Sequence, residues 1–132
     1  MKDRVFGIET EYAVIYHGRR GEASRPTNLA LYPRFESALR QRFRTLPRAL
    51  SLLRTKEGRF LENGASFHYE ATPENYEHGL IEMASPECRD PFVLLNYERM
   101  KDELMEELAE EVNRELRLGG YEGEVRIGKN NV

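Results

Sequence analysis

Three stretches of this sequence carry glutamates between apolar residues, in the pattern of a β-strand. The first, FGIETEYAVIY, contains Glu9 and Glu11, and two later stretches contain Glu70 and Glu82. Because successive side chains of a strand point to opposite faces, Glu9 and Glu11 share one face and lie about 7 Å apart. Like charges this close are unfavourable unless water, a cation or a basic partner neutralises them. The carboxylates therefore need one of these three partners.

A divalent cation is the partner that gives such a cluster a chemical use. If the three strands lie in one sheet with their glutamates on the same face, the carboxylates converge into an acidic patch. Mg²⁺ takes oxygen ligands, usually one or two carboxylates together with waters and nucleotide phosphates. His68, two residues before Glu70 on the same face, is a candidate further ligand or a group that orients a carboxylate. A solvated sheet face would show the same pattern, and spacing alone leaves both interpretations open.

Two helices are predicted around these strands. Phe35, Leu39 and Phe43 follow helical spacing and predict a helix from about Pro33 to Leu46. Pro47 then ends or kinks it, and Arg48 to Arg54 continue for another turn or two. A long amphipathic helix is predicted from Pro91 to Leu118, before Gly119 and Gly120. Its apolar stripe consists of Leu94, Tyr97, Met100, Leu104, Leu108, Val112 and Leu116.

The remaining elements are strands and loops. Turn-forming residues predict a loop from His17 to Asn28, and Asn63-Gly64 predicts a hairpin turn before a strand from Ala65 to Glu70. A loop follows from Ala71 to Gly79, then a strand from Leu80 to Ala84 and a last strand from Gly123 to Ile127. The order predicts a single α+β domain over residues 1–132, with a mainly antiparallel sheet covered on one face by helices.

Composition narrows the possible partners and environment. The chain of 132 residues has a formal net charge of −3, so no general attraction to nucleic acid or to a membrane surface is expected. The region from Arg19 to Arg59 is basic and that from Glu62 to Glu124 is acidic; we favour mutual pairing over a polyanionic ligand. The single cysteine, Cys88, excludes an internal disulfide and is predicted to be a small buried hydrophobe. No apolar run reaches membrane-spanning length, and a cytoplasmic location is expected.

Four short motifs carry a resemblance to a known family. GIETEY near the amino terminus, NGA before a strand that ends in an acid, EMASPEC, and the closing KNNV occur in the order seen in the Pup ligase and depupylase family. That family is similar to the carboxylate–amine ligases of the glutamine synthetase type. The resemblance implies a curved antiparallel sheet that binds ATP and Mg²⁺. It also implies a small Pup-like protein modifier, joined through its carboxy-terminal glutamate to lysines of substrate proteins.

The resemblance also implies roles for individual residues. Glu9 and Glu82 match the family's magnesium-binding glutamates, and Glu9 is expected to be buried among its apolar neighbours because it faces the ion. His68 stands where the family has a metal-binding tyrosine. Glu70 stands at the position of the catalytic aspartate. Ser66 and Ser85 fall at nucleotide-contacting positions, Ser66 in place of an arginine.

Several departures from the family pattern leave the activity open. Glu70 is one carbon longer than aspartate, Ser66 lacks the fixed donors of arginine, and residues Thr72 to Glu77 or nearby are extra. Family members are several times longer, so we expect an amino-terminal part of the catalytic domain, with a second chain as one way to complete the site. A ligase is favoured; a depupylase or deamidase, and a non-catalytic modifier-binding module, remain the alternatives.

Overall fold

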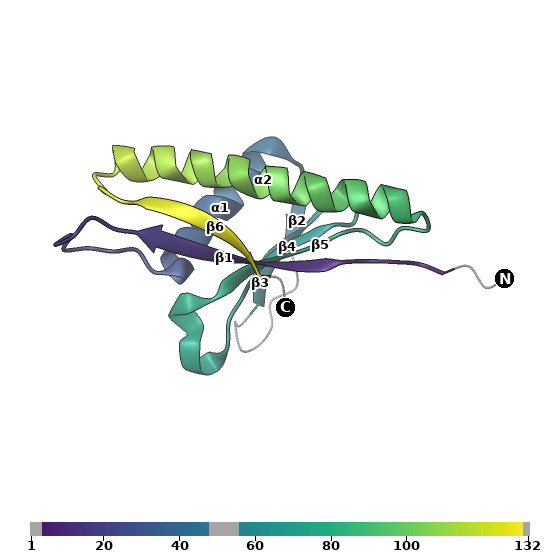
Figure 1. The fold of residues 1–132 in the computed structure, drawn as a ribbon, viewed down its shortest axis with the longest axis horizontal. Coiled ribbons are helices and arrows are strands. Elements are labelled where there is room, and N and C mark those ends of the chain that lie inside the picture. Colours follow the sequence, from purple (N-terminus) through teal and green to yellow (C-terminus); the bar gives the residue numbers. More distant parts are fainter. Residues whose placement is uncertain (1–3, 48–55, 131–132) are drawn as a thin grey trace.

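In the part of the chain that the structure describes, the strands form one antiparallel sheet with two helices on the same side (Figure 1). The structure is a computed structural model that describes residues 4–47 and 56–130. Its six strands lie in the order β2-β3-β4-β5-β1-β6, and every neighbouring pair is antiparallel. The elements are β1 (Glu9–His17), α1 (Asn28–Arg42), β2 (Thr45–Pro47), β3 (Lys56–Leu61), β4 (Ser66–Glu70), the 3₁₀ segment η1 (Pro73–His78), β5 (Leu80–Ala84), α2 (Pro91–Leu118) and β6 (Glu124–Asn130). The predicted α+β class with helices on one face is confirmed.

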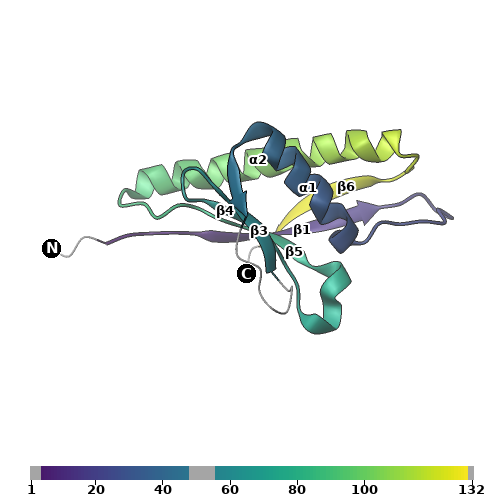
Figure 2. The ribbon, with the colours of Figure 1, turned by 180° about the vertical axis from the view of Figure 1, so that it is seen from behind.

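The hydrophobic core lies between the sheet and the helices. Viewed from behind, α1 crosses the sheet on the same side as α2 (Figure 2). The segment around η1 contacts α1, and the Asn28 side chain donates to the Gly79 carbonyl at 2.8 Å. Alternation sends every second strand residue toward the helices, which leaves the opposite face free for polar groups. The buried core comprises Tyr12, Val14, Phe67, Tyr69, Ile81 and Met83 from the strands, Leu31, Tyr32, Phe35 and Leu39 from α1, and Met105, Leu108, Val112 and Leu116 from α2.

The first helix differs from the prediction at both ends. Thr27 caps α1, because its hydroxyl accepts a hydrogen bond from the Ala30 amide at 3.2 Å, so the helix begins before Pro33 and contains it. The helix ends at Arg42, and Thr45–Pro47 forms β2 at the edge of the sheet. A residue before proline disfavours the helical conformation, and an edge strand tolerates a proline, which explains why Leu46 is extended. The predicted continuation from Arg48 to Arg54 lies outside the described residues.

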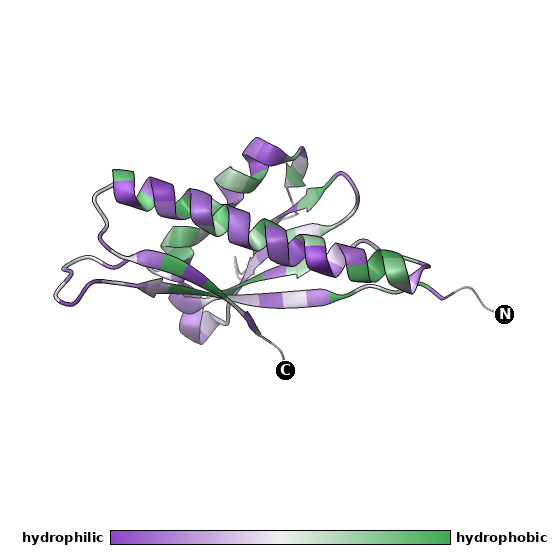
Figure 3. Ribbon diagram, turned by 45° about the horizontal axis from the view of Figure 1, so that its top comes forward, coloured by the Kyte–Doolittle hydropathy of each residue, from purple (hydrophilic) through white to green (hydrophobic). Residues whose placement is uncertain are grey.

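The long helix has the predicted bounds but a different buried stripe. Hydrophilic and hydrophobic residues alternate along α2 with helical periodicity (Figure 3). Met100, which the spacing placed in the stripe, is 58% exposed, and Lys101 is buried instead. The side of α2 that faces the sheet near its middle therefore includes Lys101 and excludes Met100. No described helix is both long enough and apolar enough to cross a membrane.

The basic and acidic regions of the sequence pair with one another, as predicted. Two ion pairs join α1 to α2, one between Arg34 and Glu115 at 3.4 Å and one between Arg42 and Glu107 at 2.5 Å. A further exposed pair joins the turn after α1 to the β3–β4 hairpin. Exposed pairs of this kind contribute less than about 1 kcal/mol each, so they orient the helices more than they stabilise the fold.

The remaining differences are local. η1 occupies most of the predicted loop between β4 and β5, and β6 reaches Asn130, further than the predicted Ile127. Tyr69 fastens η1 to the core: its hydroxyl donates to the Tyr76 carbonyl and accepts from the Gly79 amide at 2.7 Å. Cys88 is 7% exposed with its thiol 3.3 Å from the Pro86 carbonyl, which confirms the prediction of a buried, unbridged cysteine.

Candidate functional site

The strand register aligns the predicted site residues on the sheet face opposite the helices. On β5, Glu82 pairs with Glu11 of β1 on one side and with His68 of β4 on the other. In the next row Ala84 stands between Glu9 and Ser66 in the same way. Glu70 follows His68 by two residues on the same face. The expected convergence of strand carboxylates on one face is therefore present.

Within this face, His68, Glu70 and Glu82 form a compact group. His68 Nε2 lies 3.2 Å from Glu82 Oε1 and 4.0 Å from Glu70 Oε2. One ligand atom from each of the three lies within 4.8 Å of the others. The side chains of His68 and Glu82 are 3% and 9% exposed, whereas that of Glu70 is 33% exposed. The group thus has an enclosed inner pair and an outer carboxylate that solvent reaches.

These distances fit a bound cation. In an octahedral Mg²⁺ site with bonds of about 2.1 Å, adjacent ligands are about 3.0 Å apart and opposite ligands about 4.2 Å apart. The two His68 distances lie close to these values, and all three donor atoms lie within 4.8 Å of one another. An N–H at Nε2 of the imidazole would also make the contact with Glu82 attractive. One nitrogen and two oxygen donors suit Mn²⁺ and Zn²⁺ as well as Mg²⁺.

Gly58 on β3 makes room for this group. It pairs directly with His68, and a Cβ built at Gly58 would lie 2.3 Å from His68 Cβ and 2.6 Å from the Phe67 carbonyl oxygen. A side chain at this position would force β3 or His68 to move, and would so disturb the contact between His68 and Glu82. Sequence reasoning did not identify Gly58, because only the strand register shows which residue it faces.

Glu9 and Glu11 take different positions on the same face. Glu9, which we expected to be buried among apolar residues, is exposed, because the amino-terminal end of β1 lies at the rim of this face. It lies outside the compact group, one row away from Glu82. Glu11 is half-buried and lines a pocket of about 330 Å³ together with Glu70 and His78. Solvent therefore reaches the Glu9 carboxylate at the rim.

The two serines predicted to contact nucleotide are both buried on or beside this face. Ser66 is 6% exposed, and it lies in the same row as Glu9. Ser85 is 8% exposed, and its hydroxyl accepts a hydrogen bond from the Ile8 amide at 3.0 Å. The Ser85 amide donates in turn to the Ile8 carbonyl at 2.9 Å. In this structure Ser85 therefore joins the segment before β1 to the end of β5.

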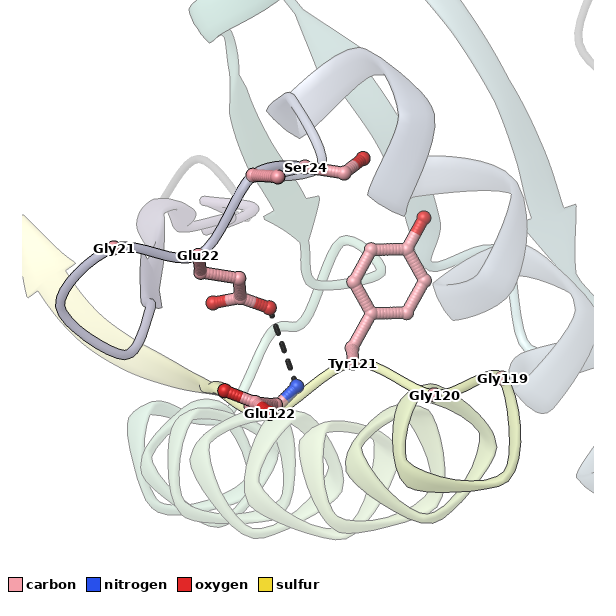
Figure 4. Close-up of a pocket in the computed structure, with 8 residues that line it drawn as sticks. Gly21, Glu22, Ser24, Gly119, Gly120, Tyr121 and Glu122 are labelled. Carbon is pink, nitrogen blue, oxygen red and sulfur yellow. Dashed lines mark hydrogen bonds between the residues drawn. The ribbon is translucent and has the colours of Figure 1, made fainter.

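A second pocket, of about 460 Å³, lies between the loop after β1 and the turn after α2 (Figure 4). It is separate from the group of His68, Glu70 and Glu82. Glu22 closes it: one carboxylate oxygen accepts from the Tyr16 hydroxyl at 2.6 Å and from the Glu122 amide at 3.2 Å. The Tyr16 hydrogen bond lowers the pKa of Glu22, and burial together with this bond raises the pKa of Tyr16. These contacts join the loop after β1 to the turn after α2.

Comparisons with known proteins place the whole chain beside one family. The family described as Pup-ligase protein matches residues 4–132. Similar proteins include the Pup–protein ligases of Brachybacterium faecium, 33% identical, Arthrobacter sp., 30% identical, and Renibacterium salmoninarum, 27% identical, each over 132 residues. These alignments cover 100% of this chain but only 24% or 25% of each relative. The chain therefore spans about a quarter of the length of the curated relatives it matches.

A solved structure has the same fold. The crystal structure of the complex between the prokaryotic ubiquitin-like protein Pup and its ligase PafA matches with a TM-score of 0.64 at 22% sequence identity. The match covers 98% of this chain and 22% of that chain. At this identity the likeness shows the fold, and it supports the fold class expected from the motifs.

Proposed function

We propose, from the premise that this chain belongs to the Pup-ligase family, that it forms the metal- and nucleotide-binding face of a protein-modifying ligase. The ligase would use ATP and Mg²⁺ to join the carboxy-terminal glutamate of a Pup-like modifier to lysines of substrate proteins. The observation that supports this most directly is the grouping of His68, Glu70 and Glu82 on the sheet face that the helices leave open.

The burial of the three side chains supports different roles for them. Glu82 and His68 are the enclosed pair, so we assign them to holding the cation, with Glu9 approaching from the rim. When bound, the cation would neutralise the charge of the transferring phosphate. Ser66 and Ser85 flank this region and are assigned to nucleotide contacts.

Glu70 is the candidate catalytic base, because its carboxylate is the accessible member of the group. In the proposed reaction the modifier's γ-carboxylate takes the terminal phosphate of ATP, and ADP leaves. The substrate lysine then attacks the activated carbonyl, phosphate leaves, and an isopeptide bond forms. Glu70 would accept the proton that the attacking amine loses. The 4.0 Å separation from His68 keeps Glu70 close to the cation yet reachable by substrate.

The test uses the full-length protein with ATP, Mg²⁺, a modifier that ends in glutamate and a lysine-bearing acceptor. We expect conjugates whose mass equals the sum of the two partners less one water. Glu82→Gln should weaken Mg²⁺-dependent ATP binding, whereas Glu70→Gln should retain binding and lose transfer. Glu74→Gln, in an exposed part of η1, is the matched control and should behave as the wild type.

Other outcomes would point elsewhere. Release of ammonia from a modifier that ends in glutamine, without conjugate formation, would indicate the deamidase of the same family. ATP binding that is equal in the wild type and Glu82→Gln would contradict the metal assignment. We also propose a cytoplasmic location, in which a free thiol such as that of Cys88 stays reduced.

A further inference from the structure

Lys101 is a buried lysine on the helix side of the sheet, directly behind the candidate site. Only 5% of its surface is exposed. Its ammonium donates to the carbonyl of Ile8 at 3.1 Å, to the hydroxyl of Thr10 at 2.9 Å and to the carbonyl of Met83 at 3.4 Å. It also forms an ion pair with Glu98, one turn earlier on α2. Lysines are almost never this buried unless they are fully paired, and this one is.

The acceptors of Lys101 are next to the site residues in the chain. Ile8 immediately precedes Glu9, and Met83 immediately follows Glu82. Thr10 pairs with Met83 in the β1–β5 register and lies between Glu9 and Glu11. One ammonium group therefore contacts both strands from which Glu9 and Glu82 project to the opposite face.

Lys101 contacts β1 at the end of the strand that is paired with β5. Among the described residues, β6 pairs with β1 only from Glu11 onward, so Glu9 and Thr10 pair with β5 alone. The Ile8 carbonyl accepts from both the Ser85 amide and Lys101. Lys101 thus adds a link between α2, β1 and β5 at the end of β1 that carries Glu9.

The charges around Lys101 balance. Glu98 also lies 3.7 Å from the ammonium of Lys129, which itself pairs with Asp102 at 3.1 Å. Two ammonium and two carboxylate groups carry no net charge together, so the network supplies little field to the opposite face. Its effect on the site must come through the position of the backbone.

We infer that Lys101 is a positioning residue for the metal site. By binding the backbone of β1 and β5 on the helix side of the sheet, it sets the distance between Glu9 and Glu82 on the opposite face. The part of this inference that concerns metal binding rests on the proposed function. Its structural part, that Lys101 holds the Ile8–Ser85 end of the two strands together, does not depend on a metal.

The test compares Lys101→Met with Lys129→Met in the full-length protein. Both variants remove one ammonium from the same network, but among the described residues the Lys129 ammonium pairs with Asp102 and Glu98 and not with a backbone carbonyl of β1 or β5. Binding of Mn²⁺ is measured by electron paramagnetic resonance, at a temperature where each variant is folded. We expect Lys101→Met to raise the Kd for Mn²⁺ by about 10-fold or more and Lys129→Met to leave it within about twofold. Equal effects of the two variants, or none, would overturn the inference.

A second measurement decides the structural part without metal. Native-state hydrogen exchange of the Ser85 amide, which bonds to Ile8, is compared with that of the Val125 amide, which bonds to Asn113 at 2.7 Å. Lys101→Met should lower the protection of Ser85 at least about tenfold more than that of Val125. Equal losses at both amides would mean a general loss of stability and would contradict the inference, even if the wild type binds no Mn²⁺ and the proposed function fails.

Thr10→Val and Thr10→Ser provide a milder pair should Lys101→Met fail to fold. Valine removes the hydroxyl that Lys101 binds and keeps the shape, whereas serine keeps the hydroxyl. Thr10→Val should change the Mn²⁺ Kd and the Ser85 protection in the same direction as Lys101→Met. Thr10→Ser should stay close to the wild type. A Thr10→Val protein that matches Thr10→Ser in both measurements would count against the inference.

Discussion

His68 and Glu82 stand opposite each other on paired strands, with Nε2 of the histidine 3.2 Å from Oε1 of the glutamate. Both side chains are almost fully enclosed, so the Glu82 carboxylate needs a partner here, which an imidazole N–H or a bound cation can supply. Glu11 on the far side of Glu82 and Glu70 beside His68 add negative charge to the same face. This concentration of negative charge is the basis of the metal site proposed above.

Gly58→Ala, on the neighbouring strand β3, should disturb the contact between His68 and Glu82. The new methyl group would meet His68 Cβ and the Phe67 carbonyl at distances that real structures do not show, so β3 or His68 must move. We expect a loss of roughly 1–3 kcal/mol of unfolding free energy in urea and weaker divalent-ion binding. Gly128→Ala, in β6, is the control, because its methyl group would lie 3.8 Å from Ala13 Cβ in ordinary contact. Equal stability of the two variants would contradict the steric argument.

Tyr12 should make the fold sensitive to alkaline pH. Burial, followed by the 2.6 Å hydrogen bond to Asp102, raises the pKa of Tyr12 well above its usual value of 10.0. The stabilisation is present below pH 10 and is lost as the pH rises from the unfolded-state pKa toward the folded-state one. We expect unfolding free energy to fall by up to about 1.4 kcal/mol per pH unit there, and Tyr12→Phe to flatten this slope. Urea unfolding between pH 8 and about 11 checks it.

The control for that experiment is Tyr97→Phe, which changes a half-buried tyrosine of α2. It should leave the alkaline slope unchanged. A slope that is unaffected by Tyr12→Phe would mean that other groups dominate alkaline unfolding.

The local parts of the fold were predictable because short-range patterns determine them. The strand from Leu80 to Ala84 and the helix from Pro91 to Leu118 have the predicted bounds, since alternation, an Asp90 cap and a stop at Gly119 are all local signals. The start of α1 was missed because Thr27 was read as part of a loop, and the cap bond to Ala30 shows otherwise. Lys101 was missed because a charged residue of an amphipathic helix is normally assigned to the surface.

For the site, the sequence indicated which residues share a face but not which of them touch. His68, Glu70 and Glu82 meet because β4 and β5 pair with His68 opposite Glu82, a register that the hairpin residues do not determine. Glu9 is one row away for the same reason. The exposure of Glu9 follows from its place at the end of β1, which the pattern of residue types alone does not give.

Glu22→Gln should loosen the loop after β1 without changing the core. Its carboxylate accepts from the Tyr16 hydroxyl and the Arg19 amide. It also accepts from the Glu122 amide (Figure 4). Because the Tyr16 bond lowers the pKa of Glu22, these contacts persist above its unfolded-state pKa and are lost as the pH falls through the lower, folded-state one. We expect faster hydrogen exchange of the Glu122 amide in the variant at neutral pH, and the same in the wild type only under strongly acidic conditions.

The control for the loop is Glu110→Gln, on the exposed side of α2, which should leave Glu122 exchange unchanged. If Glu22→Gln and Glu110→Gln exchange alike at Glu122, the carboxylate does not hold the two loops together.

The choice of metal should depend on His68. An imidazole donor favours Zn²⁺ and Mn²⁺ over Mg²⁺, whereas oxygen donors alone favour Mg²⁺. We expect His68→Gln to weaken Zn²⁺ binding at least about tenfold, because the amide replaces the nitrogen ligand, and to change Mg²⁺ binding much less. Isothermal titration of each ion into the wild type and the variant measures both affinities. His17→Gln, at the exposed end of β1, controls for histidines outside the site. A variant that binds Zn²⁺ as tightly as the wild type would show that the imidazole pairs with Glu82 through a proton and is not a ligand.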